Sequence, residues 1–402
     1  MSKNLTIRGE ALGASQEGML AVEQFLRDNY LLRFNELSGK VEYVTLPADE
    51  NPVWRVLTQK ALNSIIIRAK REQVCEKGSP KADIIELVQS DEIETFNPIR
   101  DYLEHLPKWD GQNHVARLFG RIPGISSEQL EFLSVWIRSA VAHWLQMDTL
   151  HGNECVPTLI GAQGCGKTTF VARLLPSDLR VYFLDHLNLS NKFDKEMALT
   201  NNLIVNLDEL DAIRPSQHAA LKQTLSKSKV NGRPIYGASQ DDRPRYASFV
   251  ATTNNPHPLS DATGSRRYIC LTIPEGQFID NTGEIDYEQL YAQVLYEIRE
   301  LKSPYWFNNE QVARIQELNL GYMEQKDIAE VIEACIRKPK EGEQGIRMKS
   351  GEIVELVRRE YPSIKNNHST KIYLGMAMKE LGYDGKTHGG QTYYRVIPLK
   401  AA

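Results

Sequence analysis

The sequence predicts an α/β core, preceded by a mainly helical part and followed by a small unit of two helices and a hairpin. Two observations predict the core: a glycine-rich loop between an apolar run and a helix, and three later apolar runs that alternate with polar stretches. Before the core, apolar residues recur at helical spacing, as they do from Ser127 to Met147.

The glycine-rich loop is Gly161-Ala-Gln-Gly-Cys-Gly-Lys-Thr168, which fits the pattern G-x-x-x-x-G-K-[ST] at every fixed position. It follows the apolar run Val156-Pro-Thr-Leu-Ile160, a predicted strand. It precedes Thr169-Phe-Val-Ala-Arg-Leu-Leu175, a predicted helix that stops at Pro176. Such a loop turns backbone N–H groups toward phosphate oxygens, and the start of the helix adds its unpaired N–H groups. The alternative is a glycine-rich turn before an ordinary helix.

The loop chemistry predicts a nucleoside triphosphate and Mg²⁺ as cofactors. Lys167 would reach the β- and γ-phosphates, and the Thr168 hydroxyl would hold Mg²⁺. Cys165 is expected to fill a position that needs a small residue. The residues expected to bind the nucleotide are Gly161, Gln163, Gly164, Cys165, Gly166, Lys167, Thr168 and Thr169.

Length and composition indicate a soluble globular protein. A chain of 402 residues predicts two or three domains, and 41% hydrophobic with 25% charged residues is ordinary for folded proteins. No apolar run is long enough to span a membrane, and the N-terminus lacks a signal-peptide core, so we expect a cytoplasmic protein with no membrane partner. The five cysteines form no Cys-x-x-Cys pair, which argues against a disulfide framework or a zinc site.

Charge is unevenly distributed along the chain. From Arg337 to the end there are 13 lysines and arginines against 7 acidic residues, a surplus of +6 within a total of −4, so the preceding part carries −10. This asymmetry favours an anionic partner for the C-terminal part, although a merely soluble basic domain has the same balance.

The chain divides into five predicted regions. In the first, a helix is expected from Met19 to Leu32, with two strands at Leu32-Arg-Phe34 and Val41-Glu-Tyr-Val44 and helical patterns to about residue 90. The predicted regions are an N-terminal mixed or helical region (1–94), a helical segment before the core (95–150), the core (151–300), a helical connector (301–345) and a C-terminal domain (346–402).

Two acids end a predicted strand about forty residues after Lys167. A second strand is predicted at Arg180-Val-Tyr-Phe-Leu184, and the acidic strand is Leu203-Ile-Val-Asn-Leu207, followed by Asp208 and Glu209. This is the form of a Walker-B element, in which Asp208 would bind Mg²⁺ through water and Glu209 would orient or deprotonate the attacking water. The alternative is a strand that ends in surface acids.

Polar and basic residues follow in the order that a nucleotide site needs. Ala247-Ser-Phe-Val-Ala-Thr-Thr-Asn254 is a predicted strand whose terminal Asn254 would contact the γ-phosphate and the water, unless Thr-Thr-Asn is only a turn. Arg266 and Arg267 precede the predicted strand Tyr268-Ile-Cys-Leu-Thr272. They are placed for an arginine finger from a neighbouring subunit, or for a solvated surface pair.

A basic and aromatic stretch lies between the acidic strand and Asn254. Lys227, Lys229 and Arg233 precede a predicted hairpin over Pro234 to Tyr246. Basic residues interleaved with aromatic ones suit a nucleic-acid backbone with stacked bases, while the alternative is a charged exposed loop.

Several of these segments together resemble the virulence-associated protein E family. The resemblance rests on Glu209-Leu-Asp-Ala-Ile-Arg214, Gly232-Arg-Pro-Ile-Tyr-Gly237, Ala251-Thr-Thr-Asn254 and Thr263-Gly-Ser-Arg-Arg-Tyr268. Phe96-Asn-Pro-Ile-Arg-Asp-Tyr-Leu103 and Trp109-Asp-Gly111 are similar to the family's segment before the phosphate loop, so the likeness covers roughly residues 95–275.

The resemblance implies a P-loop ATPase similar to superfamily-three helicases and AAA+ rings, carried by phages and genomic islands. It makes Lys167 and Thr168 the Walker-A pair, Asp208 and Glu209 the Walker-B pair, and Asn254 the sensor. It also implies that Arg266 or Arg267 is the finger and that the basic hairpin, with Lys227, Lys229 and Arg233, grips single-stranded DNA. Larger relatives often carry a primase, but no paired-acid primase motif precedes residue 95.

The C-terminal region has the pattern of a winged helix. After the linker Lys338 to Gly345, Ser350 is expected to cap a helix to about Glu360, and a second helix runs from Ser369 or Thr370 to Leu381. The turn Asp384-Gly-Lys-Thr-His-Gly-Gly390 then leads into a strand. In this arrangement Lys371 and Lys386 would contact DNA phosphates, and the alternative is a packing domain that does not touch DNA.

The sequence thus predicts a Mg²⁺-dependent ATPase that moves or remodels DNA for a mobile element. Its expected partners are DNA, single-stranded in the first place, copies of itself in a ring-like homo-oligomer, and a separate primase or replication protein. The alternative is an ATP-dependent DNA-binding switch that does not translocate. A small-molecule kinase is disfavoured by the acidic pair, the later sensor and the paired arginines.

Overall fold

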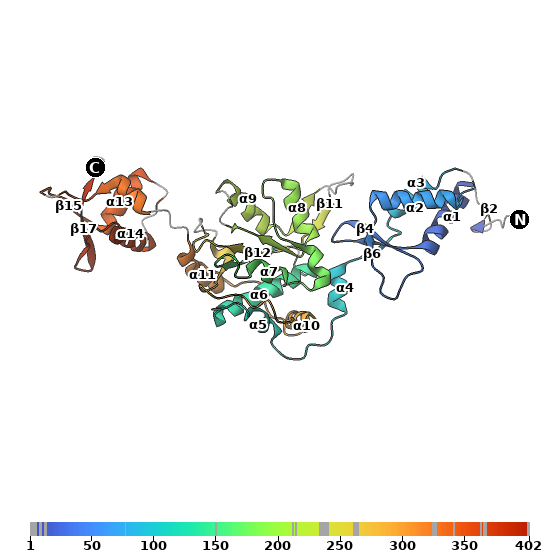
Figure 1. Ribbon diagram of the computed structural model, residues 1–402, viewed down its shortest axis with the longest axis horizontal. Helices are drawn as coiled ribbons and strands as arrows, with labels where there is room; N and C mark the ends of the chain where they lie inside the picture. Colours follow the sequence, from blue (N-terminus) through green and yellow to red (C-terminus); the bar gives the residue numbers. More distant parts are fainter. Residues whose placement is uncertain are drawn as a thin grey trace. The chain divides into compact units, whose positions relative to one another are not determined.

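The computed structural model (Figure 1) consists of two compact units, Met1–Tyr322 and Met323–Ala402. The residues it describes are 6–7, 10–11, 14–76, 78–148, 151–210, 213, 215–232, 241–259, 265–323, 328–340, 342–361, 364 and 368–399.

A five-stranded parallel sheet forms the centre of the first unit. In sequence order its strands are β7 (Val156–Ile160), β8 (Phe183–Leu184), β9 (Ile204–Leu207), β12 (Ser248–Thr253) and β13 (Tyr268–Thr272). In space the order is β13-β7-β12-β9-β8, so β12 lies between β7 and β9. The three middle strands are buried along their whole length, which is why they read as continuous apolar runs.

Four of the five strands lie where the sequence predicts them. The exception is the predicted strand at 180–184, of which only the two residues of β8 are extended. The 3₁₀ helix Ser177–Tyr182 takes up the rest, because the chain turns directly after Pro176.

Helices cover both faces of this sheet (Figure 1). On one side lie α5 (His114–Phe119), α6 (Ser127–Trp144) and α10 (Tyr287–Arg299), and on the other α8 (Lys192–Asn201) and α9 (Pro215–Ser226). Ser126 caps α6 in a capping box. The indoles of Trp136 and Trp144 in α6 are buried and donate to the carbonyls of Cys155 and Leu203. These tryptophans therefore fix α6 to the core.

A hairpin joins α9 to β12. Its strands are β10 (Lys229–Gly232) and β11 (Asp241–Pro244), with Lys229 opposite Pro244. The predicted hairpin over 234–246 was wrong in its bounds, because the first strand begins at Lys229. Residues 233–240, Arg233 among them, lie outside the described part of the chain.

The N-terminal part contains more strand than the sequence predicts. Helix α1 (Ala14–Asn29) ends three residues before the predicted Leu32, because β3 begins at Tyr30. The four-stranded sheet has the order β5-β4-β3-β6. The further elements of this part are β1 (Thr6–Ile7), β2 (Glu10–Ala11), β3 (Tyr30–Asn35), β4 (Lys40–Thr45), β5 (Arg55–Val56), α2 (Gln59–Arg71), α3 (Lys81–Val88), β6 (Glu94–Phe96) and α4 (Pro98–Glu104).

The turn between β3 and β4 fastens this sheet to the central one. Leu37 is 0% exposed and belongs to the main hydrophobic core. The Asn35 amide donates to the Tyr182 hydroxyl at 2.8 Å, and Asn97 donates to the Tyr246 hydroxyl at 3.1 Å. The N-terminal sheet is therefore anchored beside the start of β12.

The second unit has its own hydrophobic core, formed by residues such as Ile353, Leu374 and Met378. The turn from β16 to β17 is made by Gly389 and Gly390 with φ of +57° and +74°, as a two-residue hairpin loop requires. The elements are α12 (Ile328–Cys335), β14 (Ile336–Arg337), β15 (Ile346–Lys349), α13 (Ser350–Glu360), α14 (His368–Glu380), β16 (Lys386–His388) and β17 (Gln391–Pro398).

The prediction that Ser350 caps α13 was wrong. Ser350 is the first residue of the helix, and its hydroxyl donates to the carbonyl of Thr392 at 3.3 Å. Lys349 occupies the cap position, where its backbone N–H donates to Glu352 at 2.8 Å.

Candidate functional site

The glycine-rich loop lies between β7 and the short helix α7 (Lys167–Ala172), which ends three residues before the predicted Leu175. Gly164 and Gly166 have φ of +81° and +91°, in the left-handed region that favours glycine. A Cβ on Gly166 would lie 2.5 Å from the Asn281 amide nitrogen, which donates to the Gly166 carbonyl at 2.9 Å. Asn281 therefore holds the loop in a shape that only glycine permits here.

Lys167 connects this loop to the end of β12. It is 8% exposed, and its Nζ donates to the carbonyls of Gly161 and Ala162 at 2.8 and 2.9 Å. The third bond joins Nζ to Oδ1 of Asn254 at 2.8 Å. An ammonium has three N–H donors, so all of them are engaged. The predicted phosphate-binding lysine and the predicted sensor are thus in direct contact.

The remaining loop residues divide between the core and the surface. Cys165 is buried, with its sulfur 3.8 Å from Lys167 Nζ, and packs as the small residue that the sequence analysis expected. Among the residues expected to bind the nucleotide, those that are exposed are Gln163, Gly164, Thr168 and Thr169.

The predicted acids lie at the same edge of the sheet as the loop. The carboxyl ends of parallel strands meet at one edge, so the residues after β7, β9 and β12 converge there. Asp208 and Glu209 are both exposed. Glu209 has a φ of +50°, a conformation that costs a non-glycine residue about 1 kcal/mol. Such strain collects at functional sites, which favours a role for Glu209 beyond packing.

Three residues that no sequence pattern singles out are linked to Asp208 by hydrogen bonds. The Thr252 hydroxyl donates to Asp208 Oδ1 at 2.5 Å. The Asn206 amide donates to Asp185 Oδ1 at 2.9 Å and to Thr252 Oγ1 at 3.4 Å. In the sequence, Thr252 and Asn206 read as members of apolar strands, so no local pattern identifies them.

The donors at this edge suit a hard divalent cation. Thr168 and Asp208 offer exposed oxygen atoms, the ligand type that Mg²⁺ prefers, and Mg²⁺ bound with a nucleotide needs only one or two protein ligands. Within the described ranges, no three histidine, cysteine, aspartate or glutamate side chains gather into a metal-binding group. The two oxygen donors thus fit Mg²⁺ that arrives with a triphosphate.

The two arginines before β13 differ in their surroundings. Arg267 is largely buried, with its Nε 3.1 Å from Glu154 Oε2 and its guanidinium within 3.4 Å of the Ser226 hydroxyl. Arg266 is exposed. Both lie at the amino edge of the sheet, because Tyr268 pairs with Val156 at the start of β7. They are therefore at the opposite edge from the phosphate loop of their own chain.

The predicted nucleic-acid residues lie in both units. In the first unit, Lys229 is exposed on β10, whereas Lys227 pairs with Glu196 at 3.7 Å. In the second unit, Lys371 of α14 and Lys386 of β16 are exposed. Lys371 also lines a groove of about 940 Å³, whose other charged side chains are Arg347, Lys349, Arg359, Glu352 and Glu355.

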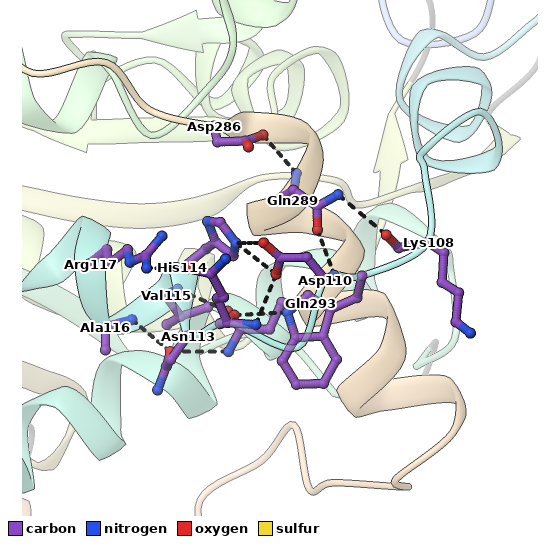
Figure 2. Close-up of polar contacts among 12 residues, drawn as sticks. Lys108, Asp110, Asn113, His114, Val115, Ala116, Arg117, Asp286, Gln289 and Gln293 are labelled. Atoms are coloured by element: carbon purple, nitrogen blue, oxygen red, sulfur yellow. Dashed lines mark hydrogen bonds and ion pairs between the residues drawn. The ribbon is translucent and has the colours of Figure 1, made fainter.

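The turn Trp109-Asp-Gly111 has a structural role (Figure 2). The Asp110 carboxylate lies 3.0 Å from His114 Nε2. The backbone N–H of Asp110 donates to the side-chain oxygen of Gln289 in α10 at 2.8 Å. The pKa of Asp110 is lowered, first by the backbone N–H of Gln112 and then by His114. Gln293, also on α10, accepts from the Val115 N–H at 3.0 Å. This network fastens α5 to α10 away from the phosphate loop.

The profile of the virulence-associated protein E-like domain matches residues 103–324, more than half of the chain. The chain belongs to the virulence-associated protein E-like family. This match confirms the resemblance inferred from the sequence motifs, and it includes the phosphate loop, the acidic strand and the arginine pair. The N-terminal sheet and almost all of the second unit lie outside the matched range of this virulence-associated protein E-like chain.

Three solved structures of the NrS-1 C-terminal region are similar at 12% identity, with TM-scores of 0.43, 0.44 and 0.44. The comparisons cover 95% of this chain and 98% or 99% of the other.

A comparison with curated proteins finds no match. Among the helices described, none combines the length and the apolar character needed to cross a bilayer.

Proposed function

We propose that this chain is a Mg²⁺-dependent ATPase with a P-loop core, which acts on DNA as a helicase-like motor in the replication of a mobile element. The observation that carries the proposal is the bond between Lys167 and Asn254 at the end of three adjacent strands. It joins the expected phosphate-binding lysine to the expected sensor, beside the strand that ends in Asp208 and Glu209. Membership of the virulence-associated protein E-like family supports the link to mobile elements.

Each side chain at this edge would have a defined task. Thr168 and Asp208 would hold the Mg²⁺, which when bound neutralises charge on the β- and γ-phosphates. Lys167 would exchange its bond to Asn254 for one to a phosphate oxygen, because its three donors are already engaged. Asn254, released from Lys167, would be free to contact the γ-phosphate, and Glu209 would orient the attacking water.

Arg266 is the better candidate for the finger, and it would act on a neighbouring subunit. Arg267 is engaged by Glu154, whereas Arg266 is exposed. The five residues of β7 separate the arginines from the loop of their own chain by about 16 Å of extended strand. An arginine side chain cannot bridge that separation, so the site would be completed by a second copy of the chain in a ring-like oligomer.

DNA would contact two basic regions. The hairpin of β10 and β11 presents Lys229 at the same amino edge as Arg266, where it would meet a single strand. The proposal that the second unit is a winged helix is supported by its order of α13, α14 and the hairpin of β16 and β17. Its exposed Lys371 and Lys386, with the groove that Lys371 lines, would suit DNA phosphates.

A subunit-mixing experiment tests the proposal. Lys167→Ala removes the phosphate ligand, and Arg266→Ala removes the finger while the nucleotide loop stays intact, so each variant alone is expected to lose ATP turnover. Mixed oligomers are expected to recover part of it, because a Lys167→Ala subunit can lend Arg266 to its neighbour. Arg267→Ala is the control, and its main effect is expected to be on stability.

Native mass and DNA stimulation are measured on the same samples. An oligomer whose ATP turnover rises with a single-stranded oligonucleotide supports the motor. Glu209→Gln is expected to bind ATP and fail to hydrolyse it. A monomer with slow, unstimulated turnover, or mixed variants that recover no activity, would contradict the motor and favour an ATP-dependent DNA-binding switch.

A further inference from the structure

A chain of hydrogen bonds runs beneath the carboxyl edge of the sheet and ends on Asp208. It starts at Asp185, directly after β8, and passes to Asn206 in β9 at 2.9 Å. Asn206 is 3.4 Å from the Thr252 hydroxyl in β12, and that hydroxyl is 2.5 Å from Asp208 Oδ1. These hydrogen bonds therefore link the ends of three neighbouring strands to one carboxylate.

The direction of these bonds is set by chemistry. An ionised Asp185 can only accept, so Asn206 must present its amide nitrogen, because its oxygen would face a negative charge if the amide were turned over. The second amide hydrogen points to Thr252, which leaves the hydroxyl hydrogen of Thr252 for Asp208. A hydroxyl donating to a carboxylate at this distance forms a short, charge-assisted bond.

Burial keeps the two middle members in place. Asn206 is 0% exposed and Thr252 is 1% exposed, so neither can exchange its partner for bulk water. The Asn206 Oδ1 atom is buried and accepts no hydrogen bond within the described residues, which leaves the two N–H donors as the groups that hold this side chain. Since Thr252 holds Oδ1 of Asp208, Oδ2 is the oxygen left for a metal-bound water.

We propose that Thr252, supported by Asn206 and Asp185, is a positioning residue that fixes Asp208 for Mg²⁺ binding. This inference rests on the proposed function, because it assigns a role within the same nucleotide site. Residues that orient a metal ligand typically contribute tenfold to a hundredfold to metal affinity. Thr252 is expected to change the affinity for Mg²⁺ only. Nucleotide affinity measured without Mg²⁺ is therefore independent of Thr252.

Thr252→Val tests the assignment, because valine keeps the shape and removes the donor. ADP affinity is measured with a chelator present, and Mg²⁺ is then titrated into the ADP-bound protein. We expect ADP affinity without Mg²⁺ as in wild type, and an increase of about tenfold or more in the Mg²⁺ concentration at half-saturation. Thr252→Ser restores the hydroxyl and is expected to return the Mg²⁺ titration close to wild type.

Thr158→Val is the matched control. Thr158 is equally buried in β7 of the same sheet, but its hydroxyl donates to the carbonyl of Val156 at 3.0 Å. We expect it to leave the Mg²⁺ titration unchanged. Asp185→Asn changes the residue at the other end of this series of hydrogen bonds, and it carries little risk to folding because the position is exposed. A several-fold weaker Mg²⁺ affinity is expected.

Two results would overturn the inference while the proposed function stands: a wild-type Mg²⁺ titration for both Thr252→Val and Asp185→Asn, or an equal loss of ADP affinity with and without Mg²⁺ in Thr252→Val. The proposed function fails separately if the wild-type protein binds ADP neither with nor without Mg²⁺, and the positioning role then falls with it.

Discussion

Replacing Arg245 by methionine is expected to lower the free energy of unfolding by about 3 kcal/mol. Arg245 lies between β11 and β12 and is 1% exposed. Its guanidinium donates to the carbonyls of Leu225 and Lys227 at 2.6 Å, of Ala247 at 2.8 Å and of Asn153 at 3.0 Å. Arg245 therefore joins the end of α9 and the base of the hairpin to the residues that precede β12 and β7.

The magnitude follows from two opposing terms. Methionine leaves four carbonyls without the donor that Arg245 supplies, at a cost of about 1 kcal/mol each. Against this, methionine keeps much of the volume and needs no hydration, whereas burial lowers the pKa of Arg245 from 12.5 to about 9 because its charge is removed from water. Apolar burial of methionine returns about 1 kcal/mol, so the net loss is about 3 kcal/mol.

Urea denaturation followed by circular dichroism measures this loss. Arg243→Met is the control, because Arg243 lies two residues away and is only partly buried, with bonds of 2.8 Å to the side chains of Thr200 and Asn201. Arg243→Met is expected to lower the free energy of unfolding by about 1 kcal/mol. If Arg245→Met stays within about 1 kcal/mol of wild type, or costs less than Arg243→Met, Arg245 does not hold these segments together.

Three further predictions concern the core, the loop and pH. Leu37→Ala is expected to cost about 2–4 kcal/mol and to expose the N-terminal sheet to protease, since Leu37 is fully buried in the main core; an unchanged digestion pattern would contradict this. Gly166→Ala is expected to abolish ADP binding, because its Cβ would meet Asn281 at a φ of +91°; calorimetry with wild-type affinity would refute it. Burial lowers the pKa of His143 from 6.5 to about 4, so as pH falls His143 is protonated in the unfolded chain before it is protonated in the folded one. About 3 kcal/mol of folding stability that is present above pH 6.5 is therefore lost as pH falls toward 4. His143→Phe should flatten that decline in urea titrations at stepped pH, and an unchanged slope would show that other groups cause it.

The local elements of the site could be predicted from the sequence. The strands β7, β9 and β12 are continuous apolar runs because neighbours bury them, and this signal survives in a single sequence. The loop follows from glycine spacing. Asp208 and Glu209 could be predicted as a pair because they directly follow an apolar strand.

Contacts between distant segments could not be predicted. The position of β12 between β7 and β9 is set by packing, and it alone brings Asn254 to Lys167, 87 residues away. Thr252 gives no signal of its own, because threonine is common in strands and its partner Asp208 is distant in sequence. The anchoring of the N-terminal sheet by Leu37 is hidden for the same reason, since one leucine in a turn has no periodicity.

The central claim is that Lys167 binds nucleotide phosphate, and nucleotide binding by Lys167→Ala tests it most directly. Titration of a fluorescent ATP analogue with Mg²⁺ into the full chain is compared between wild type and variant, with circular dichroism to confirm that both are folded. We expect tight binding by wild type and a loss of about a hundredfold or more in the variant, since an ionic phosphate contact and the link to Asn254 disappear together. Equal affinity in the two folded proteins would contradict it.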